Sequence, residues 1–237
     1  MPYRRLPNTD SARIRSLKAA INKMHSSVYA YNREIITLDI QTLELMLRDF
    51  ESAQVLYKQS LDRQASENRK FQKLAKNARL YISHFVQVLN LCIIRGEIKK
   101  EVKLLYKMEE DNFAVPDLST NDSIITWGEN VIKGENVRLQ QGGAPIYNPT
   151  IARVNVAFSL FKDAYFSQKT YQNTTTRQLN ILSDQRNDID KILCTLWNQI
   201  EEAFANLETE QRLEKCKEFG VVYYLRKSEK AKLHNQT

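Results

Sequence analysis

Glycine and proline are scarce in this chain of 237 residues, which has only 6 glycines and 5 prolines. Leu, Glu, Gln, Lys, Arg and Asn are abundant instead, and helices tolerate most of these residues well. The composition therefore predicts an all-α protein. No apolar run approaches the roughly 20 residues that span a bilayer, and no apolar stretch follows the basic N-terminus as in a signal peptide. We expect no transmembrane segment and a cytoplasmic location.

Cysteine and histidine are equally rare, with 3 residues of each. Cys92, Cys194 and Cys216 are widely spaced and form no CxxC pair, and the sequence contains no HExxH, HxxxH or ExxH motif. These absences argue against a disulfide framework, a metal centre and a ferritin-like site. No nucleophile with an adjacent base stands out either, so we expect no cofactor and no enzymatic activity.

Positive charge is concentrated at the two ends of the chain. The net charge is +7, with +5 in residues 1–27 and +3 in residues 225–237, so the body between them is close to neutral. A nucleic-acid binder would use the basic ends, and the candidate contacts at the N-terminus are Arg4, Arg5, Arg13 and Arg15. Basic termini are also commonly only solvated.

A long helical pattern begins at Leu43. Apolar residues recur at spacings of 3 and 4 up to Cys92, and no glycine or proline interrupts residues 43–92. The pattern predicts one long helix that stops at Gly96. Its apolar stripe has a polar gap at Ser60, Gln64 and Glu67.

A second stripe from Ile151 to Ile200 repeats the first at an offset of 108, with its own polar gap at Gln168, Gln172 and Thr175. The match suggests an internal duplication, with repeat units 6–117 and 118–226 around a pseudo-twofold axis. Two ordinary amphipathic helices in one bundle are the alternative. Both interpretations predict an elongated all-α bundle of two long antiparallel helices plus shorter ones. We treat 1–237 as one domain with a flexible basic tail at 227–237.

The two polar gaps would meet in an antiparallel pairing of the long helices. Facing positions would then sum to about 236, which places Phe71 near Tyr165. The meeting point would be a polar layer or ligand site, unless its residues face solvent. Its candidate residues are Ser60, Gln64, Glu67, Gln168, Gln172 and Thr175.

The segment "RLQQGGAPIYNPT" at 138–150 is the most irregular part of the chain. Gly142 or Gly143 fits a helix C-cap, and Asn148 fits an N-cap with Pro149 at the first helical position. The segment therefore predicts a corner between helices. A ligand-binding loop at Gly142, Gly143, Pro145 and Tyr147 is the alternative, although no phosphate-loop motif is present.

Near the C-terminus, "FGVVYYLRK" combines a breaking glycine with a β-branched and aromatic run. This pattern predicts a short strand rather than a helix. Because a lone strand has unpaired backbone groups, it would lie along its own bundle or pair with a second copy of the chain.

Five blocks of sequence are distinctive: "RRLPNTDSARIRSLKAA", "ARLYISHFVQVLN", "WGENVIKGE", "GGAPIYNPTIA" and "EKCKEFGVVYYLRK". Together they resemble an uncharacterised family of all-helical proteins from Bacteroidetes, over nearly the whole chain. The family has no assigned activity, so the resemblance implies only a bacterial, non-secreted protein. The sequence as a whole favours a non-catalytic binding or scaffolding protein that acts through protein partners or self-association. A nucleic-acid-associated accessory protein that uses the basic termini is the alternative.

Overall fold

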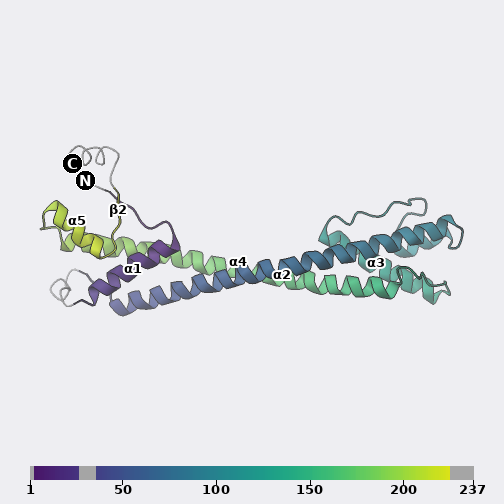
Figure 1. Cartoon of the computed structure of the whole chain (residues 1–237), viewed down its shortest axis with the longest axis horizontal. Coiled ribbons are helices and arrows are strands. Elements are labelled where there is room, and N and C mark those ends of the chain that lie inside the picture. The colour runs from purple at the N-terminus through teal and green to yellow at the C-terminus, as the bar shows by residue number, and fades with distance from the viewer. Residues whose placement is uncertain (1–2, 27–35, 225–237) are drawn as a thin grey trace. The chain divides into compact units, whose positions relative to one another are not determined.

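A computed structural model describes residues 3–26 and 36–224 of the chain. Helices dominate these residues, and the two longest are α2 (Ile40–Ile94) and α4 (Ile151–Ala203). The two run antiparallel: within 61–174, Asn68 lies opposite Gln168 and Phe71 opposite Tyr165, so one number rises as the other falls. The all-α bundle built on two long antiparallel helices is confirmed (Figure 1).

The α2 helix runs without a break because nothing in it disrupts the backbone ladder. Its end follows the predicted stop, since Gly96 has φ +75°. The N–H groups of Gly96 and Glu97 donate to the carbonyls of Ile93 and Cys92, both at 2.9 Å. These bonds satisfy two of the carbonyls that a helix end leaves open.

The chain divides into two compact units. Unit 1 comprises residues 1–60 and 175–237, and unit 2 comprises residues 61–174. Each unit thus takes part of α2 and part of α4. The predicted repeat units 6–117 and 118–226 cut across this division, so the duplication stays a prediction. The basic tail predicted at 227–237 lies outside the described residues.

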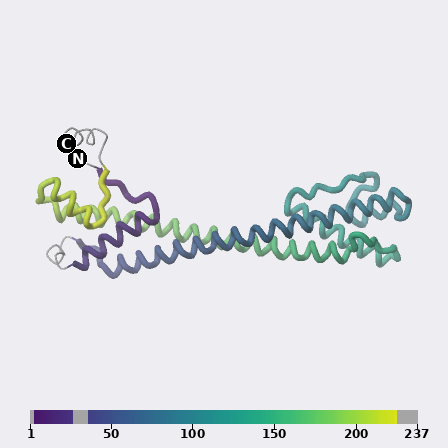
Figure 2. Tube along the Cα trace, viewed as in Figure 1, coloured from purple at the N-terminus to yellow at the C-terminus, as the bar shows by residue number. Residues whose placement is uncertain are grey.

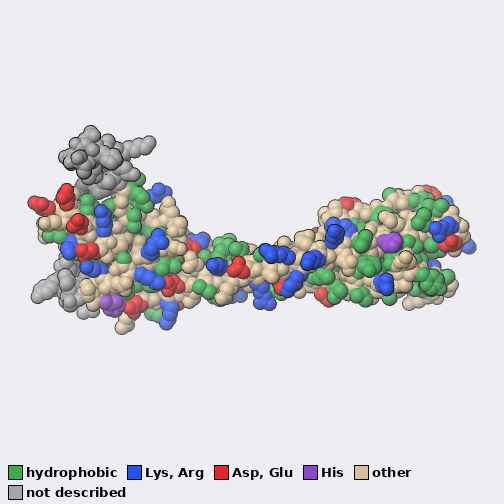
Figure 3. Space-filling view, in the orientation of Figure 1, with side chains coloured by type: hydrophobic (Ala, Val, Ile, Leu, Met, Phe, Trp, Pro, Cys, Tyr) green, Lys and Arg blue, Asp and Glu red, His purple; other side chains and the backbone are tan. Residues whose placement is uncertain are grey.

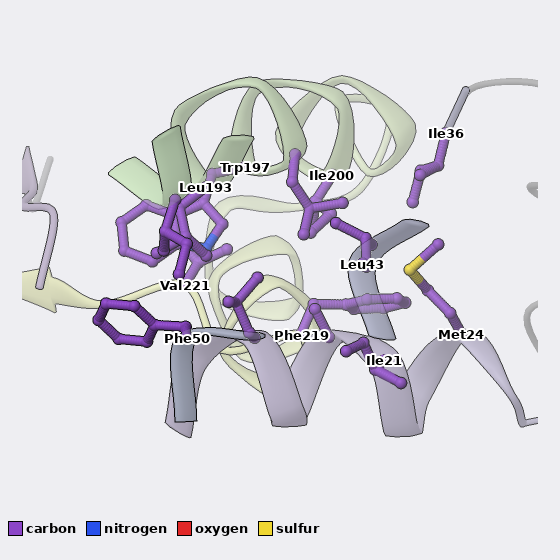
Figure 4. Close-up of a cluster of buried hydrophobic side chains, with 14 of the residues drawn as sticks. Ile21, Met24, Ile36, Leu43, Phe50, Leu193, Trp197, Ile200, Phe219 and Val221 are labelled. Atoms are coloured by element: carbon purple, nitrogen blue, oxygen red, sulfur yellow. The ribbon is translucent and has the colours of Figure 1, made fainter. Parts of the chain in front are cut away.

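In unit 1, α1 (Asp10–Met24) and α5 (Thr209–Glu218) join the start of α2 and the end of α4. The side chain of Thr9 accepts a hydrogen bond from the Ala12 N–H and caps α1. Apolar faces of all four helices close over one core (Figure 4). Its labelled residues are Ile21, Met24, Ile36, Leu43, Phe50, Leu193, Trp197, Ile200, Phe219 and Val221.

The predicted strand near the C-terminus pairs within its own chain. β2 (Tyr223–Tyr224) lies antiparallel to β1 (Tyr3–Arg4), with Tyr3 opposite Tyr224. In Figure 2, the purple segment with β1 and the yellow segment with β2 lie side by side where these strands pair. The strand therefore pairs with a segment of its own chain, which is the first of the two alternatives.

In unit 2, η2 (Lys100–Tyr106) and α3 (Asn121–Gln140) pack against one another and join the end of α2 and the start of α4. Thr120 and Ser123 form a reciprocal capping box at the start of α3. The core of this unit is rich in aromatic and β-branched residues. Its fully buried members include Ile82, Phe85, Val86, Leu89, Tyr106, Ile124, Val131, Val154 and Phe161.

The predicted N-cap of α4 is wrong by two residues. Thr150, rather than Asn148, precedes the helix, and its hydroxyl oxygen accepts a hydrogen bond from the Arg153 N–H at 3.4 Å. Threonine is among the residues favoured at a helix N-cap, because its side-chain oxygen can accept a bond from a free N–H of the first turn. Within the described ranges, none of the helices combines the length and the apolar character needed to cross a bilayer.

Candidate ligand pocket at the α3–α4 corner

A pocket of about 590 Å³ in unit 2 is lined by residues from the end of α2, from η2 and the segment before it, and from the α3–α4 loop. The four candidate loop residues of the sequence all line it, so the corner and the cavity are made by the same segment. The lining comprises Val88, Cys92, Glu97, Ile98, Lys99, Val102, Arg138, Gln141, Gly142, Gly143, Ala144, Pro145, Ile146 and Tyr147.

Two glycines allow the loop to turn so tightly. Gly142 has φ +88°, a conformation that side chains other than glycine rarely adopt, which is the predicted C-cap geometry. Gly143 donates its N–H to the carbonyl of Arg138 at 3.0 Å. A Cβ atom at Gly143 would lie 2.6 Å from Nη1 of Arg138. The loop can therefore lie directly on the guanidinium only because residue 143 has no side chain.

Arg138 donates hydrogen bonds to Glu135, to Ala144 and, from Nε at 3.2 Å, to the hydroxyl oxygen of Tyr106. Its Nε and Nη2 atoms donate to the two carboxylate oxygens of Glu135 at 2.8 and 2.7 Å. Nη2 also donates to the carbonyl of Ala144 at 2.7 Å, which ties the loop to α3. The hydroxyl of Tyr106 donates to Glu135 at 2.5 Å. Tyr106, Glu135 and Arg138 are all buried, so the guanidinium is fixed in place before any ligand arrives.

The charges of this cluster follow from its surroundings. The hydrogen bonds that Arg138 donates to Glu135 raise the pKa of Arg138, which stays charged. Burial raises the pKa of the Tyr106 hydroxyl, which stays protonated and can act as a donor. The Nη1 atom of Arg138 makes no hydrogen bond to any described residue. It lies beside Gly143 in the pocket lining and has two N–H groups to offer.

Cys92 lines the same pocket and is half-buried. Burial raises the pKa of its thiol, and the neighbouring Glu97 raises it further. Because the thiolate is the reactive form, this environment disfavours a nucleophilic role. Cys92 is therefore better suited to lining the pocket than to attacking a ligand.

The candidate polar-layer residues are divided between the two units. In unit 1, the hydroxyl of Thr175 donates to the carbonyl of Ser60 at 3.3 Å. In unit 2, Nε2 of the buried Gln168 donates to Asn68 at 3.4 Å, whereas Gln64 and Glu67 are half-buried. Gln172, expected to face Gln64, is exposed. Each unit therefore contains a polar contact in the interhelical seam, but Gln172 contributes to neither.

The basic candidates at the N-terminus differ in their surroundings. Arg4 forms an ion pair with Glu201 at 3.2 Å, and Arg13 binds both oxygens of Asp190 at 2.8 and 2.7 Å. Arg5 and Arg15 are exposed and form no ion pair with a described residue. Acidic and basic side chains are mixed on the visible face of unit 1 (Figure 3). Two of the four candidate nucleic-acid contacts, Arg4 and Arg13, are thus already paired with carboxylates of the protein itself.

Sequence reasoning missed Tyr106 and Glu135. A signal existed for Glu135, because it continues the apolar register of Ile124 and Val131 in α3 and has Arg138 one turn later. A charged pair on the apolar face of a helix indicates a buried ion pair. The sequence contains no such signal for Tyr106, because Tyr106 lies in η2 and its contact with Glu135 depends on how η2 packs against α3.

The comparisons with known proteins add no relative. No family model, no curated protein and no solved structure matches this chain. The resemblance to helical proteins of Bacteroidetes therefore stays a prediction based on its sequence blocks. Within residues 3–26 and 36–224, no cluster of His, Cys, Asp and Glu could hold a metal ion.

Proposed function

We propose that this chain is a non-catalytic binding protein and that the pocket at the α3–α4 corner is its ligand site. One observation carries the proposal: a buried, fixed Arg138 presents unused donors at the wall of a pocket of about 590 Å³. Ligand sites are commonly cavities of roughly 300–1,000 Å³ with apolar walls and a few fixed polar groups. This pocket has both properties.

The lining defines the kind of ligand. Val88, Ile98, Val102 and Ile146 supply apolar walls, while Arg138 supplies N–H donors. Arginine lacks acceptors, so the ligand must supply the acceptor, and carboxylates fit a guanidinium best. The site therefore suits a small molecule with an apolar body and one carboxylate or carbonyl group.

Ligand-observed NMR with 1-naphthoate, its uncharged amide and 1-naphthylmethylamine tests this proposal on the full chain. The carboxylate and the amide each offer an acceptor to Arg138, so we expect stronger saturation transfer to them than to the amine, whose only opposite charge among the described lining residues is Glu97. Val102→Phe fills the pocket and should abolish transfer. Leu104→Phe is the matched control, since Leu104 lies in the same helix, is 59% exposed and does not line the pocket. Equal transfer in both variants would refute the assignment of the site.

Action through a protein partner or through self-association remains a second prediction. A pull-down from a bacterial lysate with and without nuclease separates a protein partner from a nucleic-acid one. The nucleic-acid alternative receives less support, because Arg4 and Arg13 form ion pairs within unit 1. Its remaining basic candidates are Arg5 and Arg15.

A further inference from the structure

A second pocket, of about 460 Å³, lies in unit 1 between the start of α1 and the turn that leads from α5 into β2. Among the described residues, three basic side chains line it, Arg5, Arg15 and Lys217, and no acidic one does. Each basic residue comes from a different part of the chain: the β1–α1 segment, α1 and the end of α5. The sequence therefore gives no hint that Lys217 belongs with the N-terminal arginines.

The walls of this pocket are set by backbone contacts. The Arg5 N–H donates to the carbonyl of Val222 at 3.2 Å, which fixes the segment that carries Arg5. Gly220 has φ +81°, and a Cβ atom there would lie 2.6 Å from the carbonyl oxygen of Ser16. The turn after α5 thus lies directly on the backbone of α1. This close approach brings Lys217 to the same pocket as Arg15.

The carboxylates next to this pocket are engaged elsewhere. Both oxygens of Asp10, at the start of α1, accept hydrogen bonds from Arg186 at 2.7 Å. Glu218, which follows Lys217, pairs with Lys23 at 2.6 Å and with Lys215 at 3.4 Å. Neither carboxylate compensates the lining residues, and Arg5, Arg15 and Lys217 form no ion pair with any described residue. Three uncompensated positive charges around one hollow attract anions.

We infer that this pocket is a binding site for a small multivalent anion, a compound with several phosphate or carboxylate groups. The guanidinium groups of Arg5 and Arg15 can each donate two parallel hydrogen bonds to a phosphate or carboxylate. The ammonium group of Lys217 adds a third positive charge. The pocket is independent of the unit 2 site, because the two share no residue. Its ligand is also different: a compact charged molecule rather than one with an apolar body.

Isothermal titration calorimetry of the full chain at low ionic strength tests the inference, with sodium tripolyphosphate and citrate as probes. We expect at least one of them to bind, and the affinity to fall as salt is added. Arg5→Gln/Arg15→Gln should weaken binding at least about tenfold, since each charge-assisted contact contributes strongly. Lys58→Gln/Arg177→Gln removes the same charge from exposed positions of unit 1 outside the pocket and should change affinity less than about twofold.

Amide NMR signals give a second measurement, which does not depend on those variants folding. Tripolyphosphate or citrate should shift the signals of Gly220 and Val222 and leave that of Gly143, which lines the unit 2 pocket, in place. Tighter binding of tripolyphosphate supports a phosphorylated ligand, and tighter binding of citrate a carboxylic one. No binding of either probe to the wild type, or equal losses in both double variants, would overturn the inference. So would a single-stranded oligonucleotide that displaces the probe at much lower concentration, because the site would then serve nucleic acid.

Discussion

Glu135 and Arg138 lie one turn apart in α3 and form a two-point salt bridge inside the core of unit 2, with side chains 1% and 6% exposed. Removing one partner of such a pair leaves the other charge buried and uncompensated. We expect Glu135→Ala to lower the free energy of unfolding by about 3–5 kcal/mol in urea denaturation. Glu135→Leu/Arg138→Met, which removes both charges, should cost less than either single change.

The matched control for this prediction is the pair of Glu67 and Lys70 in α2, which has the same spacing, a distance of 2.8 Å and side chains that are 30% and 69% exposed. Solvent screens that pair, so Glu67→Ala should cost less than about 1 kcal/mol. Similar costs for Glu67→Ala and Glu135→Ala would contradict the buried position of the α3 pair.

The Tyr106 hydroxyl makes the stability of unit 2 fall with increasing pH in the alkaline range. Burial raises its pKa, so the folded chain holds this proton more tightly than the unfolded chain does. The resulting stabilisation is complete below the unfolded pKa of about 10 and is lost as pH rises above it. Above pH ~10, the free energy of unfolding should therefore fall more steeply in the wild type than in Tyr106→Phe, by up to about 1.4 kcal/mol per pH unit. Tyr147→Phe, at a side chain that is 79% exposed, should retain the wild-type slope in the same urea titrations.

Gly128 permits α3 to lie close to α4. A Cβ atom at this position would come within 2.3 Å of the Phe158 ring. Alanine normally favours a helix over glycine by about 1 kcal/mol, but here we expect Gly128→Ala to destabilise by about 1–3 kcal/mol through overpacking. Phe158→Leu should relieve the clash, so thermal denaturation of the double variant should show a smaller loss than the two single losses added together. Additive losses would mean that the two side chains do not compete for space.

Gln168 and Gln172 have different environments although they lie one turn apart in α4. Gln168 is 7% exposed, and its Oε1 atom has no hydrogen-bond partner among the described residues. Replacing a buried, half-satisfied amide by an apolar side chain removes a desolvation penalty, so Gln168→Leu should raise the free energy of unfolding by about 1 kcal/mol. Gln172 is exposed, and Gln172→Leu should have an effect within about 0.5 kcal/mol. A marked destabilisation by Gln168→Leu in urea denaturation would show that Gln168 is fully hydrogen-bonded.

The long helices and their pairing could be predicted because each depends on a simple pattern along the sequence. Uninterrupted stretches without glycine or proline give the helices, and the polar gaps give the antiparallel register. The expected neighbours Phe71 and Tyr165 do lie together, with ring centroids 6.5 Å apart. The duplication stays a prediction, although each unit combines two shorter helices with parts of both long helices.

The pocket residues were predictable only in part. The glycines and prolines of the α3–α4 loop stand out in a helical sequence, so the loop could be named as a candidate site. Lining residues from α2 and η2 could not, because their convergence depends on how the helices pack. The same holds for Lys217, whose place beside Arg15 results from the backbone contact at Gly220.

The division of the chain into 1–60 with 175–237, and 61–174, has a consequence for synthesis on the ribosome. Unit 2 is contiguous in sequence, so all of its residues have been made once residue 174 has emerged. The first 60 residues must wait for the last part of the chain before they can bury their apolar faces. Because domains fold during synthesis in the order in which they are completed, the middle of this protein can fold before its beginning. The N-terminal segment is then the part of the nascent chain that is exposed longest to chaperones and proteases.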